Sequence, residues 1–92
     1  MDNVQGPEPE QLAQQDPSER VQETMLRMGS HLQEQGHVNE AMDMYVKLLE
    51  DYPDTQASRA AANALVSLAQ FLEQSGMPHM ALHVYRKLEE FQ

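Results

Sequence analysis

The chain has 92 residues, no cysteine and a formal charge of −9 at neutral pH, with 6 basic and 15 acidic residues. A chain of this length is expected to form one small domain, and without cysteine it has no disulfides, thiolate metal ligands or thiol nucleophiles. Its acidic balance disfavours roles in which a protein binds nucleic acid or an anionic membrane surface directly.

Residues 1–15, MDNVQGPEPEQLAQQ, contain two prolines, a glycine and several glutamines, with no basic side chain. Such a composition buries too little apolar surface to offset the entropy of ordering, so we predict a flexible acidic tail, disordered in the free protein. It has neither the basic start nor the apolar stretch of a signal peptide, and no later run has the roughly 20 apolar residues that span a bilayer. A cytoplasmic protein is therefore expected.

Order is predicted to begin at Asp16, which can cap a helix, followed by Pro17, a residue suited to the first helical position. An apolar stripe with helical spacing follows, made of Val21, Met25, Met28 and Leu32. We expect the first helix to cover about residues 17–35 and to end near Gly36.

A second helix is predicted after this glycine, with Asn39 as a plausible cap. Its apolar stripe consists of Ala41, Met44, Tyr45 and Leu48. Proline lacks the amide donor that a helix interior needs, so the helix should end before Pro53.

Two further helices follow in the same arrangement. Asp54 or Thr55 is expected to cap an alanine-rich third helix that stops at Gly76, and Pro78 opens the fourth. The fourth apolar stripe consists of Met80, Ala81, Val84, Tyr85 and Leu88. No strand pattern occurs, so we predict an all-α domain over residues 16–92 with two helix–turn–helix units, about 17–53 and 54–91.

The two units repeat each other forty positions apart. Identical residues pair Gly36 with Gly76, Ala41 with Ala81, Tyr45 with Tyr85, Lys47 with Lys87, Leu48 with Leu88, Glu50 with Glu90 and Leu32 with Leu72. In physical terms, the glycine turns the chain, the alanine permits close helix contact, and the tyrosine is expected to fill the gap between the two helices of its unit.

This pattern resembles the tetratricopeptide repeat. The first unit carries it at Met25, Met28-Gly29, Leu32, Ala41, Tyr45, Leu48 and Pro53, and the second at Leu65, Leu68-Ala69, Leu72, Ala81, Tyr85 and Leu88. The resemblance implies two antiparallel helix pairs stacked with right-handed twist. The family repeats at about 34 residues, so the longer period here is a departure, and leucines replace its usual Tyr or Ala at several positions. A generic four-helix bundle is the alternative fold.

The outer flanks of the two units differ in polarity. Met42, Val46 and Leu49 are apolar on the side that should pack against the following unit, whereas their counterparts are Leu82, Arg86 and Glu89. Because terminal repeats need a polar outer face, the second unit is expected to end the array. Leu82 and Phe91 remain as candidates for self-association, which could stabilise an array of only two units.

In the family that this chain resembles, partners bind mainly in a concave groove lined by the first helix of each unit. Carried over, the groove residues are Glu23, Leu26, Ser30, Gln33, Asn63, Val66, Gln70 and Glu73. The cations that hold a partner's terminal carboxylate in some family members are missing, so we expect an apolar or basic protein segment as the partner. This implies a protein-interaction adaptor or scaffold that is not an enzyme and needs no cofactor.

Two alternatives remain open at this stage. One is a structural subunit, or the soluble domain of a larger and perhaps membrane-tethered assembly. The other is a metal-dependent factor that uses His79 and His83, which are spaced i, i+4 on the fourth helix. Since no third ligand is indicated, no metal site is predicted, and exposed surface residues are the simpler explanation for this pair.

Overall fold

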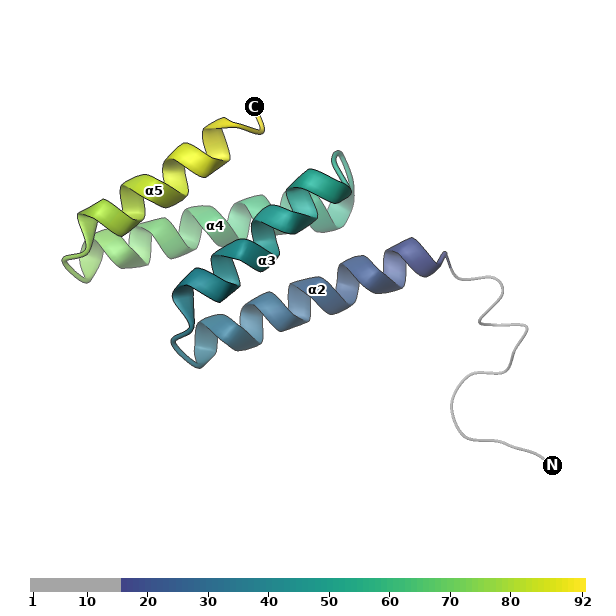
Figure 1. Cartoon of the computed structure of the whole chain (residues 1–92), viewed down its shortest axis with the longest axis horizontal. Helices are drawn as coiled ribbons and strands as arrows, with labels where there is room; N and C mark the ends of the chain where they lie inside the picture. The colour runs from purple at the N-terminus through teal and green to yellow at the C-terminus, as the bar shows by residue number, and fades with distance from the viewer. Residues whose placement is uncertain (1–15) are drawn as a thin grey trace.

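A computed structural model describes residues 16–92, which contain four helices and no strand. The helices are α2 (Pro17–Glu34), α3 (Val38–Asp51), α4 (Gln56–Gln74) and α5 (Pro78–Glu89). They form two helical hairpins, α2/α3 and α4/α5, joined by the segment between α3 and α4 (Figure 1). The prediction of an all-helical domain is confirmed. The predicted tail, residues 1–15, lies outside the described residues.

The turns of the two hairpins have the same hydrogen bonds. In the first, the amide of Gly36 donates to Gln33 O and that of His37 donates to Leu32 O, at 3.0 and 2.8 Å. The second repeats this pattern forty residues later, at 3.1 and 2.8 Å. Both glycines have positive φ, 85° and 79°, a conformation that side chains disfavour, which explains why glycine stands at both turns.

Helix starts are fixed partly by side-chain caps. The Asp16 carboxylate accepts a hydrogen bond from the Ser18 amide at 3.0 Å, and Thr55 forms a capping box with Ser58. The prediction of Asn39 as the second cap is wrong, because α3 already begins at Val38 after His37, which makes no side-chain cap bond. The bonds of the glycine turn position the start of α3 without a polar cap.

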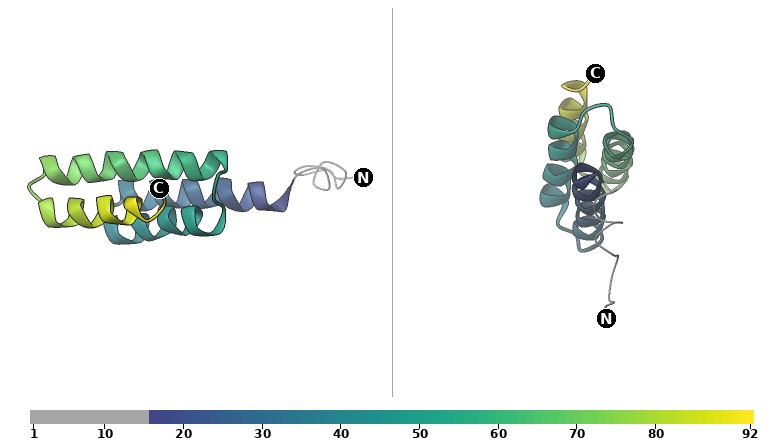
Figure 2. Two further views of the ribbon diagram at one scale, coloured as in Figure 1. Left: turned by 90° about the horizontal axis from the view of Figure 1, so that it is seen from above. Right: turned by 90° about the vertical axis from the view of Figure 1, so that its right-hand side faces the viewer.

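The core lies between the helices and centres on α3 and α4. In the views of Figure 2, α2 and α4 lie on one side of the molecule and α3 and α5 on the other. The largest fully buried side chains are Leu48, Leu65, Leu68, Leu72 and Val84. Burial of such side chains provides about 1.5–3 kcal/mol each relative to exposure.

One apolar stripe is less buried than the sequence predicts. Val21 and Met28 were expected on the packed side of α2, but they are 44% and 46% exposed. The physical reason is that α2 packs mainly against α3 and α4, and within residues 16–92 no helix precedes it to cover this face.

The two repeated tyrosines pack to different depths. Tyr45 is only 3% exposed and its ring lies on Gly29, where an added Cβ would be 2.6 Å from Cε1. Tyr85 is half-buried, and the residue equivalent to Gly29 in its unit is Ala69, whose methyl group leaves less room for a ring. The expectation that both tyrosines fill the gap inside their hairpin therefore holds fully only for Tyr45.

Candidate functional site

A hollow on the surface lies between the N-terminal parts of α2 and α4. It has a volume of about 700 Å³. Its lining residues are Asp16, Glu19, Gln22, Glu23 and Leu26 from the α2 side and Thr55, Gln56, Ala57 and Ala60 from the α4 side. We call it the α2/α4 hollow. Its volume falls in the range of roughly 300–1,000 Å³ typical of ligand sites.

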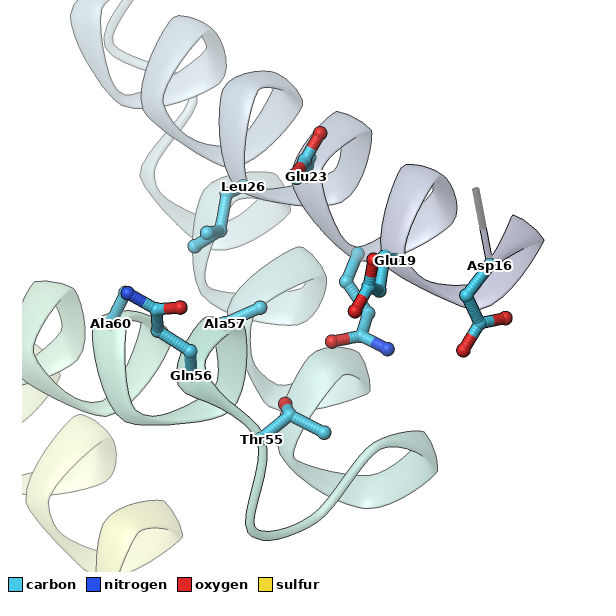
Figure 3. Close-up of a pocket in the computed structure, with 9 residues that line it drawn as sticks. Asp16, Glu19, Glu23, Leu26, Thr55, Gln56, Ala57 and Ala60 are labelled. Carbon is cyan, nitrogen blue, oxygen red and sulfur yellow. The ribbon is translucent and has the colours of Figure 1, made fainter. Parts of the chain in front are cut away.

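Helical spacing brings the α2 residues of this hollow together. Glu19, Glu23 and Leu26 follow one another at i, i+4 and i+7, and therefore share one face of α2. The start of α4 is held opposite this face by the capping box at Thr55, with both of its hydrogen bonds at 3.0 Å. Figure 3 shows Leu26 projecting from α2 toward the first turns of α4.

The lining of the α2/α4 hollow combines acidic, neutral polar and apolar side chains. Three of its nine lining residues are carboxylates, Asp16, Glu19 and Glu23, and none is basic. Leu26 of α2 and two alanines of α4, Ala57 and Ala60, provide the apolar part of the lining. Carboxylates accept strong hydrogen bonds from ammonium and guanidinium groups, whose aliphatic stems lie favourably on apolar surface. The hollow is therefore chemically suited to lysine and arginine side chains.

The structure brings only part of the predicted groove together. Glu23 and Leu26 line the α2/α4 hollow, whereas the other predicted residues lie outside it. The outer ones are exposed on α2 or α4, namely Ser30, Asn63, Val66 and Gln70. Gln33 and Glu73 accept hydrogen bonds from the tyrosine hydroxyls of their own hairpins, at 3.3 and 2.8 Å. These two side chains thus contribute to packing within each unit.

Sequence reasoning missed Asp16 and Glu19 as site residues. Asp16 was considered only as a helix cap, Glu19 was not singled out, and the repeat comparison gave no reason to connect either with the start of α4. A usable signal was present in the i, i+4 spacing of Glu19 and Glu23 next to Leu26, because this spacing places two carboxylates beside an apolar side chain.

The two tyrosine hydroxyls have raised pKa values for different reasons. For Tyr45 the main cause is burial, which disfavours the phenolate, and the negative charge of Glu34 adds to it. For Tyr85 the hydrogen bond to Glu73 is the first cause of the raised pKa, followed by burial and by the charge of the same carboxylate. Both tyrosines are therefore neutral hydrogen-bond donors at physiological pH, which is a packing role.

The histidine pair lies on a different hollow, between α3 and α5. His79 and His83 border a space of about 190 Å³ together with Val38, Asn39, Met42, Met80 and Val84. Most of this lining is apolar. Within residues 16–92 no group of three or more His, Asp or Glu side chains is placed to hold a metal ion.

The candidates for self-association also occupy different environments. Leu82 is 47% exposed on α5, beside the exposed side chains of Arg86 and Glu89. Phe91 is half-buried against the core and borders a third hollow of about 230 Å³ next to Leu49. The two residues therefore do not form one continuous exposed apolar surface.

No helix in the described part of the chain combines the length and apolar character needed to cross a membrane. Comparisons with protein-family models, with curated proteins and with solved structures find no match for this chain.

Proposed function

We propose that this protein is an interaction module that binds a basic segment of a partner protein in the α2/α4 hollow. The observation that carries the proposal is the lining of this hollow, which combines three carboxylates with the apolar side chains of Leu26, Ala57 and Ala60 and contains no basic residue. The equal hydrogen bonding of the two hairpin turns further supports the resemblance to tetratricopeptide repeats. In that family, this side of the first helices is where partners bind.

The spacing of the carboxylates indicates what the partner segment should look like. Glu19 and Glu23 are one helical turn apart, about 6 Å along the α2 axis. Two cations separated by about the same distance occur at i, i+4 on a helix or at i, i+2 on an extended strand. An apolar side chain between or beside them would rest on Leu26. We therefore expect a segment with two lysines or arginines flanking a leucine-like residue.

The free energy of binding in this hollow is expected to come mainly from a small number of ion pairs and one apolar contact. An exposed ion pair provides about 0.2–1 kcal/mol, so two pairs would change affinity by up to about thirtyfold. Such pairs weaken as salt screens the charges. Affinity for a single segment is thus expected to be modest and sensitive to salt.

The direct experiment is a fluorescence anisotropy titration of the full chain with a labelled helical peptide that has lysines at i and i+4 around a leucine. The expected result is saturable binding that weakens about tenfold in the double variant Glu19→Gln/Glu23→Gln. The matched control is Glu89→Gln/Glu90→Gln, which removes the same charge at the far end of α5. Equal weakening in both variants would show that only net charge attracts the peptide, and would contradict the proposed site.

A further inference from the structure

The lining of the α2/α4 hollow includes a buried polar side chain that the described chain leaves without a partner. Gln22 lies one turn after Glu19, on the face of α2 that borders this hollow. The residue is only 8% exposed. Within residues 16–92, its carboxamide makes no hydrogen bond with a backbone group or with another side chain. Its donors and its acceptor also have little access to bulk solvent.

Ser58 shows how the same fold treats another buried polar side chain. It is 3% exposed, and its hydroxyl donates to the Thr55 carbonyl at 2.9 Å and accepts from the Thr55 amide at 3.0 Å. Buried polar groups are nearly always hydrogen-bonded in this way, because the bonds that they lose to water have to be replaced. The carboxamide of Gln22 therefore points to a partner from outside the described chain, and the hollow is where such a partner can reach it.

The chemistry of a carboxamide defines that partner further. Its oxygen accepts hydrogen bonds and its NH2 group donates them, so it is fully satisfied only by a group that has a donor and an acceptor. Lysine and arginine side chains have donors only, and the carboxylates of Glu19 and Glu23 are the stronger acceptors for them. A peptide group offers both an N–H and a C=O. The backbone of a bound segment is thus the group that matches Gln22.

Backbone groups are free to bind only in some conformations. In an α-helix, the N–H and C=O groups bond to one another along the helix, so a helical segment presents its side chains alone. In an extended segment, the N–H and C=O of one residue point to the same edge, as they do when two strands pair. One carboxamide can therefore bind both groups of that residue.

The spacing along α2 also suits an extended segment. Glu19 and Glu23 are about 6 Å apart along the helix axis, and side chains at i and i+2 of an extended segment are about 6.6 Å apart on one side. Gln22 lies between the two glutamates along the axis, three residues after the first and one before the second. A segment residue between two cations therefore lies level with the carboxamide.

On the basis of the proposed function, we infer that the basic partner segment is extended and that Gln22 binds the N–H and C=O of the residue between its two cations. The cations at i and i+2 pair with Glu19 and Glu23, and a leucine-like side chain at i+4 lies toward Leu26. Gln22 then selects extended segments over helical ones. The chain's own residues 1–15 do not supply such a segment, since they contain no basic side chain.

Two labelled peptides test which conformation the hollow selects. The first has lysines at i and i+2 and leucine at i+4, with threonines between them, because β-branched residues favour an extended backbone. The second is the helical lysine–leucine peptide, which carries the same two lysines and one leucine. In anisotropy titrations of the full chain, the extended peptide is expected to bind about fivefold or more tightly. Equal or tighter binding of the helical peptide would overturn the inference.

An ester bond in the extended peptide locates the backbone contact. Replacing the amide N–H of the threonine between the lysines with an ester oxygen removes one donor, and is expected to weaken binding about fivefold. The matched control places the same ester at the last residue of the peptide, where it should leave the affinity unchanged. Equal affinities of the two ester peptides would refute the contact with this residue.

Gln22→Met removes the carboxamide and keeps the length of the side chain. It is expected to weaken the extended peptide about tenfold, to leave the helical peptide unaffected and to abolish the effect of the central ester. The free chain should melt about 4 °C higher, because an apolar side chain replaces an unpaired buried amide. Gln74→Met, at the exposed last residue of α4, is the matched control and should change neither binding nor melting.

The outcomes distinguish this inference from the proposed function. A Gln22→Met variant that melts lower and binds the extended peptide as the parent does would assign the carboxamide to the fold and overturn the inference. If Glu19→Gln/Glu23→Gln weakens both peptides while Gln22→Met and the central ester weaken neither, the extended conformation is refuted and the α2/α4 hollow stands as the site. If neither peptide depends on the two glutamates, the proposed function is refuted and this inference with it.

Discussion

Replacing Gly29 with alanine should destabilise the domain, although alanine is the better helix former. In an exposed helix interior this change would stabilise by about 1 kcal/mol. Here, however, the added Cβ would lie 2.6 Å from Cε1 and 2.9 Å from Cζ of Tyr45, a ring that is only 3% exposed. Forcing a methyl group into a packed core costs about 1–3 kcal/mol. The expected net result is a loss of about 1 kcal/mol in the free energy of unfolding.

Urea denaturation followed by circular dichroism measures this change, and thermal melts should show a decrease of about 4–8 °C per kcal/mol for a domain of this size. The decisive control repeats Gly29→Ala in a Tyr45→Leu background, which lacks the ring atoms that clash. There the same substitution should raise the free energy of unfolding by about 1 kcal/mol, so the sign reverses. If Gly29→Ala stabilised the parent itself by that amount, the close contact between the ring and α2 would be refuted.

Three other changes test the packing and the caps. Tyr45→Ala should lower the free energy of unfolding by about 3–5 kcal/mol, a loss large enough to prevent folding. Tyr85→Ala should lower it by less, because the Tyr85 ring is only half-buried, and denaturant unfolding compares the two variants. Thr55→Ala removes the α4 cap and should cost about 1–2 kcal/mol in the same assay, while an equal stability of this variant would show that the capping box adds nothing. The free energy of unfolding should also fall as the pH rises above 10.0, because the pKa of both tyrosines is higher in the folded state and the unfolded chain therefore releases their protons first. This fall should be smaller when both tyrosines are replaced by phenylalanine.

The elements with local signals were predictable from the sequence. Gly36 and Gly76 marked both hairpin turns because most side chains disfavour the positive φ of these positions and glycine does not. Pro53 limited α3, and Thr55 was one of two residues named for the cap that it forms. In each case the decisive interaction lies within a few residues of the signal, so the pattern and the structure agree.

The features that depend on neighbouring helices were not predictable in the same way. Periodicity placed Met28 with the core residues, yet its exposure depends on whether a helix precedes α2, which no local pattern reports. The repeat equated Tyr85 with Tyr45, but Ala69 in place of glycine changes the space for the ring. For the candidate site, Glu23 and Leu26 were identified, whereas Glu19 was missed because the hollow forms only when the first turns of α2 and α4 meet.

The most direct test of the proposed binding site is a map of amide chemical shifts in the isotopically labelled full chain as the lysine–leucine peptide is added. Binding in the α2/α4 hollow predicts the largest shifts at Glu19, Glu23 and Leu26 and across the gap at Ala57 and Ala60. Shifts concentrated on α3 or α5, or uniform small changes that vanish with a slight increase in salt, would contradict the assignment of this hollow as the site for a basic partner segment.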